Sequence, residues 1–459
     1  MLTISAAQRR LRLLRRHHLA RETPAGSVAE ATGGMIVLHA TDPATVYVSA
    51  LVRAPQATLD DVSAALYDDR SVVKVIAMRR TMFVTPTDFV PVVHSAAGLA
   101  IADRLRRQLI QHLSTLPTDP PVEGDVAAWL ADVENGTEKA VDERGEALAN
   151  ELAKAEPRLR TAVLPTTDKK WDVKQNITSR VLALMGADGR IVRGRPAGTW
   201  LSRQHRWASV RGLWPDGLPD VPVAEARAEL VRRWLRVFGP ATVADVQWWT
   251  GWTLGLTRAV LAGLDTADVD LDGEPGVVLA DDTEPEADVA PVATLLPALD
   301  PTPMGWQRRD WFLGPHRDAL FDRNGNIGPT VWWGGWWAGG ACATAPSGGG
   351  CSRTPAPRPL PPSSRRPPRW SSASAARRSS RASARRWSGS SPTADSGRPT
   401  RPGAVPTGDP GDSRIAAAAR LRNRRGRHRT RRRNRSPCGR HSVFSPSPPS
   451  PRSSPAPVR

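Results

Sequence analysis

The sequence predicts an α+β protein built from tandem winged helix-turn-helix units, followed by a C-terminal β-rich part and a disordered basic tail. Two observations lead to this fold class. Amphipathic helices followed by pairs of β-branched strands recur three times along the chain, and the composition changes abruptly near residue 340. We therefore predict units at residues 1–115, 116–215 and 216–340, the last including the C-terminal strands, and a tail at 341–459.

The predicted tail differs in charge from the rest of the chain. Residues 341–459 contain 26 arginines, no lysine and three acidic residues, a net charge of +23, whereas residues 1–340 carry 38 basic and 42 acidic residues, a net charge of −4. Apolar residues in the tail are too sparse to offset the entropy of ordering, which predicts disorder. One interpretation is a basic arm that binds nucleic acid by counterion release. The other interpretation is that the tail is translated from a shifted reading frame. The Arg, Pro, Ala, Gly and Ser content favours it, because GC-rich codons yield these residues in a wrong frame.

The composition of residues 1–340 excludes several classes of protein. All three cysteines lie beyond this segment, so it can hold neither a disulfide framework nor a thiolate metal site. The histidines lack the spacing of metal ligands, and we predict no metal and no cofactor. No apolar run approaches the roughly 18–20 residues that span a bilayer, and the N-terminus lacks the apolar segment of a signal peptide. We predict a cytoplasmic, nucleoid-associated protein.

Capping signals define the helices of the first unit. Ser5 and Gln8 form the pattern of a capping box, and Asp42 precedes Pro43 in the pattern of an N-cap followed by proline at the first helical position. The predicted helices follow Ser5 and cover residues 28–38, 43–52 and 59–67. Residues 71–86 are rich in β-branched side chains, which predicts strands. Helices followed by a strand pair form the outline of a winged helix.

The same outline recurs twice. The second unit is predicted to contain helices over 146–153 and 173–185 and a hairpin at 190–202 with its turn at 196–198. The third unit is predicted to contain helices over 224–237 and 254–264, a capping box of Thr242 and Asp245, and strands at 269–271 and 276–279. The outward face of the third unit offers little besides Arg258, so we interpret this unit as a scaffold.

A β-rich part completes the predicted fold. Its strands are expected at residues 311–313, 319–322 and 328–333. Asn324-Gly325 is the signal of a type I′ hairpin turn. The chain contains 17 tryptophans, and core and interface filling explains most of them.

Five segments carry a resemblance to a known family. They cover residues 37–49, 65–86, 296–301, 304–306 and 320–326. The chain resembles the bacterial winged-helix DNA-binding proteins whose studied members are the AlkZ/YcaQ-type DNA glycosylases. This resemblance spans roughly residues 5–333, and it implies tandem winged helices around a DNA duplex. It also implies hydrolysis of the bond between the sugar and an alkylated purine.

The resemblance also locates the expected catalytic motif. In the studied members it is a glutamine, an apolar residue, and then glutamine or aspartate; the matching positions here are His39, Ala40 and Thr41. With an unperturbed pKa of about 6.5, His39 could deprotonate the attacking water. Thr41 could hold the same water, and Asp42 could stabilise positive charge on the sugar. Alternatively, His39 is a hydrogen-bonded histidine at a helix junction and Asp42 is only an N-cap.

Basic and polar residues on the predicted wings and on one helix indicate contact with DNA. Wing arginines suit phosphates and narrow minor grooves. The candidate DNA-binding residues are Arg79, Arg80, Lys174, Gln175, Arg190, Arg193, Arg195, Arg203 and Arg206. The competing interpretation is that these arginines only keep an exposed hairpin hydrated and contact no DNA.

Three functions remain open from the sequence. The first is a monofunctional DNA glycosylase, expected to be a monomer, that acts on alkylated purines in double-stranded DNA, with His39 replacing the usual glutamine. The second is a non-catalytic DNA-binding protein, either a regulator or a lesion sensor, that keeps the fold without the motif. The third is a protein whose winged helices mediate only protein contacts.

Overall fold

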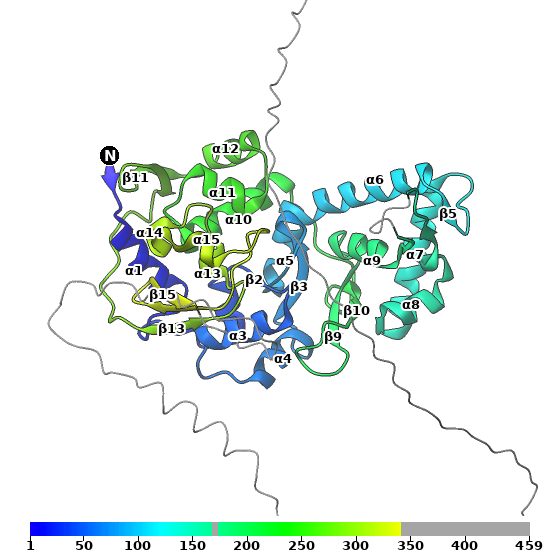
Figure 1. Cartoon of the computed structure of the whole chain (residues 1–459), viewed down its shortest axis with the longest axis horizontal. Helices are drawn as coiled ribbons and strands as arrows, with labels where there is room; N and C mark the ends of the chain where they lie inside the picture. The colour runs from blue at the N-terminus through cyan, green and yellow to red at the C-terminus, as the bar shows by residue number, and fades with distance from the viewer. Residues whose placement is uncertain (168–172, 341–459) are drawn as a thin grey trace, which may run out of the picture. The chain divides into compact units, whose positions relative to one another are not determined.

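Small, mostly antiparallel sheets alternate with helices in the computed structural model, which describes residues 1–167 and 173–340 (Figure 1). These residues form five three-stranded sheets, and the predicted α+β class is confirmed. The predicted tail at 341–459 lies outside the described residues. Within the described ranges, every helix is too short or too polar to span a bilayer.

The first sheet combines the predicted strand pair with a short strand that precedes it. Its strands are β2 (Leu38–His39), β3 (Val72–Ala77) and β4 (Thr81–Pro86), in the order β2-β4-β3. His39 lies opposite Phe83 in the antiparallel β2–β4 pair. The helices of this region are α1 (Ala6–Arg16), α2 (Val28–Gly33), α3 (Pro43–Arg53), α4 (Leu59–Tyr67) and α5 (Val90–Val93). The helix predicted at 28–38 is too long, because Leu38 pairs with Val84 in the sheet.

The N-caps predicted at Ser5 and Asp42 are present, but the capping box predicted at Ser5 is wrong, because the Gln8 side chain bonds to the backbone of Glu286 instead. The side chains of Ser5, Asp42 and Thr58 each accept a backbone N–H in the first turn of α1, α3 and α4. Each satisfies an N–H that has no partner within its own helix, which fixes where the helix begins. Asp42 therefore sets the start of α3 directly after β2.

The second region, which runs from α6 to β10 (residues 99–209), has its own helices and a second hairpin. Its helices are α6 (Leu99–Thr115), α7 (Val126–Arg144), α8 (Ala149–Ala155) and α9 (Thr178–Ala187). Strands β6 (Glu146–Leu148), β10 (His205–Ser209) and β9 (Ile191–Pro196) form one sheet, and β5 (Thr118–Asp119), β7 (Ala162–Val163) and β8 (Gln175–Asn176) form another. The long helices α6 and α7 were not predicted. α6 contacts both α7 and α9 (Figure 1).

Two helix predictions in this region are wrong at their N-terminal ends. Residues 146–148 are a strand, because they pair with β10. The helix predicted at 173–185 begins only at Thr178, because Gln175 and Asn176 pair with β7. In both cases pairing with a distant strand overrides the local helix pattern. The hairpin predicted at 190–202 is also longer, since its second strand begins at His205.

The third region follows the prediction closely. Its helices are α10 (Val223–Phe238), α11 (Val243–Thr250) and α12 (Leu254–Ala262), and its hairpin is β11 (Thr266–Asp270) and β12 (Pro275–Leu279). Thr242 and Asp245 form the predicted capping box at the start of α11. The N-terminal strand β1 (Leu2–Thr3) joins this hairpin by pairing in parallel with β11. The first residues of the chain thus add a third strand to the hairpin of residues 266–279.

The C-terminal part contains both strands and short helices. Its elements are β13 (Ala293–Leu296), α13 (Pro301–Met304), α14 (Asp310–Leu313), α15 (Arg317–Leu320), β14 (Thr330–Trp333) and β15 (Trp336–Gly340). The strand predicted at 311–313 is wrong, because these residues lie in α14. The strand predicted at 319–322 is also wrong, because α15 extends to Leu320 and only Phe321 forms an isolated bridge, with Ile327. The type I′ turn is also wrong, since Gly325 has a positive φ of 81° but Asn324 does not. Instead, the Asp322 carboxylate accepts the backbone N–H groups of Asn324 and Asn326.

The buried side chains of the described residues form two large hydrophobic cores. One contains buried residues from the first region together with others from the third region and the C-terminal part, including Phe83, Trp234 and Trp332. The other is formed almost wholly by the second region and includes Leu130 and Trp207. A smaller cluster joins the two hairpins, with Val73 of β3 packed against Val192 of β9. Shared cores do not by themselves set domain boundaries, so the three-unit division remains a prediction.

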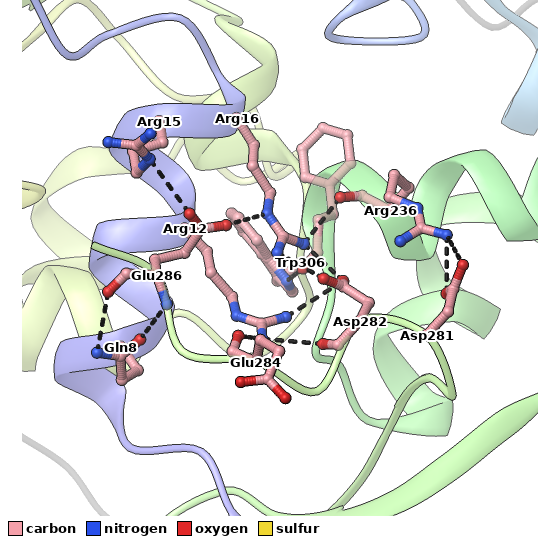
Figure 2. Close-up of polar contacts among 11 residues, drawn as sticks. Gln8, Arg12, Arg15, Arg16, Arg236, Asp281, Asp282, Glu284, Glu286 and Trp306 are labelled. Carbon is pink, nitrogen blue, oxygen red and sulfur yellow. Dashed lines mark hydrogen bonds and ion pairs between the residues drawn. The ribbon is translucent and has the colours of Figure 1, made fainter. Parts of the chain in front are cut away.

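Ion pairs fasten α1 to the segment that follows β12 (Figure 2). The Asp282 carboxylate accepts hydrogen bonds from Arg12 at 3.2 Å and from Arg16 at 2.7 Å. The Glu286 carboxylate accepts another from Arg16 at 2.8 Å. Arg12 is almost fully buried, so its charge requires these acceptors. This clamp joins the start of the chain to residues about 270 positions later.

Candidate active site

A cavity of about 620 Å³ lies beside the first hairpin turn, within the range of small-molecule sites. Its lining comes from β2, the β3–β4 turn, α9, α11 and the C-terminal loops. The lining residues are His39, Thr41, Ile76, Arg79, Arg80, Thr81, Met82, Ala183, Trp248, Leu299, Met304, Asn324, Gly325 and Asn326. The structure thus brings four predicted site residues together: His39, Thr41, Arg79 and Arg80.

His39 lies on the cavity wall with little solvent contact. Its side chain is 6% exposed, and its ring centroid is 4.8 Å from that of Phe83. Its Nδ1 atom is buried and has no hydrogen-bond partner in the described part of the chain. Burial, reinforced by the nearby Arg79 charge, lowers the pKa of His39 to about 4. The premise of an unperturbed pKa near 6.5 is therefore wrong, and His39 is a neutral hydrogen-bonding group at neutral pH.

The turn between β3 and β4 presents two arginines in an uncommon backbone conformation. Arg79 and Arg80 have φ values of 56° and 61°, in the left-handed region that residues other than glycine rarely occupy. The Arg79 Nη1 donates to the Trp248 carbonyl at 3.1 Å, and its guanidinium carbon lies 4.3 Å from the Trp248 ring centroid. Gly251 permits this approach, because a Cβ there would lie 2.8 Å from Arg79 Cγ. The hairpin tip is thus fixed against the end of α11.

A buried ion pair lies next to the lining residue Leu299. Asp300 follows the lining residue Leu299, and both of its carboxylate oxygens accept from Arg53, at 2.8 and 2.9 Å. Ser49 donates a further hydrogen bond to Asp300 at 2.7 Å, and the Thr302 N–H donates another at 2.9 Å. Burial alone would raise the pKa of Asp300, but Arg53 and these donors hold it below its usual value. Arg53 and Asp300 are therefore both ionised, and their opposite charges offset each other.

Thr41 and Asp42 differ in their relation to the cavity. Thr41 is exposed and lines it. The Asp42 carboxylate accepts the Ala44 N–H at 2.9 Å and lies 3.9 Å from an Arg203 nitrogen, and Asp42 is absent from the lining. The contacts of Asp42 are those of an N-cap.

The predicted DNA-binding residues of the second region lie outside the cavity lining. Arg190 bonds to the carboxylates of Glu134 and Glu138, so its charge is already compensated. The Arg193 guanidinium carbon lies 3.9 Å from the Trp207 ring centroid, and burial lowers the pKa of Arg193 to about 10.

The other candidates differ in exposure, and Arg206 is half-buried like Arg193. Arg206 donates to the Pro196 carbonyl at 3.4 Å. Lys174 and Gln175 are both exposed, and Lys174 forms an ion pair with Asp119 at 2.5 Å. None of these contacts identifies a ligand, so their DNA contacts stay predictions.

The loop of the second hairpin is anchored on the first region. Arg195 pairs with the Asp68 carboxylate, and Arg203 lies near Asp42. Between them, the Trp200 ring centroid lies 4.8 Å from that of Tyr47. The second wing is therefore held by contacts with α3 and with the residues that follow α4.

Several lining residues were not predicted as site residues. Trp248 was one of many tryptophans assigned to core filling, and nothing local distinguishes it. Leu299, Met304, Asn324 and Asn326 lie in the C-terminal segments that carry the resemblance, and that resemblance was the available signal. Arg309 lies behind Trp248, with its guanidinium carbon 4.7 Å from the ring centroid.

Comparisons with known proteins identify the family and the fold. The model of the family described as DNA glycosylase AlkZ-like matches residues 32–375. The solved structure of the Streptomyces sahachiroi DNA glycosylase AlkZ superposes with a TM-score of 0.55 at 18% identity, covering 74% of this chain and 88% of that one. At this identity the likeness shows the fold alone. No curated protein matches. Because the family model covers most of its length, the chain belongs to the AlkZ-like DNA glycosylase family.

Proposed function

We propose that the protein binds double-stranded DNA, takes a damaged base into the cavity beside His39, and hydrolyses the bond between that base and its sugar. One observation carries this proposal. His39 occupies the first position of the family's expected motif and lies on the cavity wall with a buried, unpartnered Nδ1. Buried polar atoms without partners are rare in folded proteins, and they mark places where a ligand or water completes the hydrogen bonding.

The residues can support hydrolysis of a glycosidic bond. The reaction passes through an oxocarbenium-like state and needs a positioned water together with a pocket that holds the nucleotide. His39, neutral at physiological pH, can accept a hydrogen bond from the water, and the Thr41 hydroxyl can hold the same molecule. Trp248 adds an aromatic side chain to the cavity lining, and Arg79 packs over its ring. Alkylated purines, which the sequence resemblance implies, are the first substrates to test.

Exposed cations near the cavity suit the DNA backbone. Arg80 is exposed on the first hairpin turn, and the Arg203 side chain is 83% exposed on the second hairpin loop. Guanidinium groups bind phosphate through paired N–H donors. We infer that these two arginines contact phosphates on either side of the extruded nucleotide.

A base-excision assay tests the function. A duplex with one N7-methylguanine would be incubated with the protein and then treated with mild alkali, which cleaves DNA at abasic sites. We expect strand breaks at the lesion above the protein-free background. If the protein retards the duplex in a gel but leaves every lesion of an alkylated and deaminated panel intact, the glycosylase proposal is wrong.

The residues at the motif positions also suggest a second function. His39 and Thr41 stand where the resemblance implies glutamine and then glutamine or aspartate. A non-catalytic DNA-binding protein, either a regulator or a lesion sensor, would keep the cavity and the arginines without the usual motif. Lesion-dependent binding without excision would support this alternative.

A further inference from the structure

The loop of residues 322–326 lines the cavity and is held together from within. Asn324, Gly325 and Asn326 belong to the lining. The Asp322 carboxylate accepts the backbone N–H groups of Asn324 at 2.8 Å and of Asn326 at 2.9 Å, and the Asn326 side-chain amide donates to it at 3.0 Å. Hydrogen bonds from Asn326 and Asn324 lower the pKa of Asp322, so the carboxylate is ionised and keeps these bonds at neutral pH.

The ends of this loop are tied to Leu299, another lining residue. Phe321 and Ile327 form an antiparallel bridge where the loop begins and ends, and the Ile327 carbonyl accepts the Leu299 N–H at 3.1 Å. The next residue, Asp300, is fixed by its buried ion pair with Arg53. The loop and Leu299 are therefore both held in place without a ligand.

Backbone strain gathers at this cavity. Of the seven described residues other than glycine that have a positive φ, three line it: Arg79, Arg80 and Leu299. A left-handed backbone is unfavourable for a residue with a Cβ, and such conformations persist where the surrounding structure imposes them, often at ligand sites. The strain at Leu299 therefore favours a role for its apolar side chain in the cavity.

Asn324 offers an uncommitted amide in the same lining. The residue is exposed, and its side chain has no hydrogen-bond partner among the described residues. By contrast, the Asn326 amide nitrogen donates to Asp322. A side-chain amide presents a donor and an acceptor side by side, and this pair matches a neighbouring acceptor and donor on the edge of a nucleic-acid base.

We propose that Asn324 and Leu299 recognise the extruded base: the Asn324 amide hydrogen-bonds to its edge, and the Leu299 side chain packs against it. The proposal rests on the entry of a base into the cavity, as proposed above. Enzymes that extrude a base read it through hydrogen bonds to its edge and contact with apolar side chains. The class of base that fits keeps a donor and an acceptor side by side, as N7-methylguanine does with its N1–H and O6.

The edge contact is tested with Asn324→Ala. This change removes no hydrogen bond within the loop, so the midpoint of guanidinium denaturation should stay unchanged. We expect single-turnover release of N7-methylguanine, corrected for the protein-free rate, to slow by about tenfold, the rate equivalent of one hydrogen bond. Asn150→Ala, at an exposed asparagine of α8 outside the lining, is the matched control.

A duplex without the base separates base contact from backbone contact. A tetrahydrofuran abasic analogue keeps the phosphates and lacks the base, so Asn324→Ala should bind it as tightly as the wild type in gel retardation. Wild-type release of N7-methylguanine by the variant, or weaker binding to the abasic duplex, overturns the assignment of Asn324.

The apolar contact is tested with Leu299→Asn. Asparagine is similar in size and tolerates the left-handed backbone, so the turn is kept while the apolar surface is lost. We expect N7-methylguanine release to slow by about tenfold, the low end of the effect of a lost apolar contact in a pocket, and abasic-duplex binding to stay unchanged. Release at the wild-type rate would mean that Leu299 only shapes the turn.

Failure of the glycosylase function gives a different result. If the wild type releases no base, the measurement becomes its affinity for the N7-methylguanine duplex relative to the abasic duplex. Asn324→Ala should then lower this ratio by about tenfold. A wild type without any such preference, or a variant with the same preference, overturns the base contact itself.

Discussion

Arg53 and Asp300 form an ion pair in which neither side chain is exposed, with two nitrogen–oxygen distances of 2.8 and 2.9 Å. The pair joins α3, which begins four residues after His39, to the residue next to Leu299, which lines the cavity with a positive φ of 59°. It therefore fixes two walls of the cavity relative to each other. The same pairing keeps the pKa of Asp300 below its usual value despite its burial.

Breaking this pair should destabilise the protein strongly. Asp300→Asn keeps the shape of the side chain and leaves the Arg53 charge buried without a counterion. We expect the free energy of unfolding to fall by about 3–5 kcal/mol, the range for removing one partner of a buried pair. Guanidinium denaturation followed by tryptophan fluorescence measures the change. Asp281→Asn, which breaks an exposed pair with Arg236, is the control and should leave the midpoint nearly unchanged.

Local signals in the sequence were sufficient for the part of the site near the first hairpin. The β-branched run at 71–86 predicted the strands that carry Arg79 and Arg80, and the Asp42-Pro43 pattern predicted the start of α3. These features depend on neighbours within a few residues, so the sequence carries them directly. The motif position of His39 came from the resemblance.

The remaining walls depend on contacts that no local pattern contains. Trp248 and Asn324 reach the cavity because α1, α10 and the C-terminal part share one core with the first region. The low pKa of His39 likewise results from burial and from Arg79, which lies 40 residues away in the chain. Residues 311–313 were predicted as a strand, yet they form a helical turn that packs in that core.

His39 can be tested with two variants. His39→Ala should keep the fold and most of the DNA affinity, and we expect base release to slow by about 10²–10⁴-fold, as for loss of a positioned acid-base group. His39→Gln restores the residue that the family motif implies and should recover most of that loss. Single-turnover excision gives the rates, and gel retardation gives the affinity. If His39→Ala releases bases as fast as the wild type, His39 has no role in catalysis.

The salt dependence of DNA binding tests the proposed phosphate contacts. Replacing both Arg80 and Arg203 with alanine should lower the slope of log K against log salt by about 1.8, because two phosphate contacts are lost. Arg190→Ala should leave the slope unchanged, because Glu134 and Glu138 already compensate that charge. Arg193 and Arg195 form a third variant pair, predicted from the sequence to contact phosphates as well. An unchanged slope in the Arg80 and Arg203 variant would remove both residues from the interface.

Stability should depend on pH through buried histidines. Burial lowers the pKa of His39 to about 4, and it also lowers that of His17 well below the ordinary value. In the unfolded chain a histidine binds its proton near pH 6.5, so below that pH the unfolded state carries more protons than the folded state. The free energy of unfolding should therefore fall as the pH drops from 6.5 toward 4.

The contribution of His39 can be isolated with the glutamine variant. Between pH 6.5 and pH 5, one histidine that stays neutral in the folded state contributes a loss of about 1.6 kcal/mol, because the slope rises from half of 1.36 kcal/mol per pH unit at pH 6.5 toward its full value. His39→Gln removes this contribution, so its stability should fall less steeply than that of the wild type over the same interval. Guanidinium denaturation at pH 7.0, 6.0 and 5.0 measures both curves. Parallel curves would mean that His39 is protonated in the folded protein at pH 5, and its proposed role as a neutral acceptor for the attacking water would then fail at that pH.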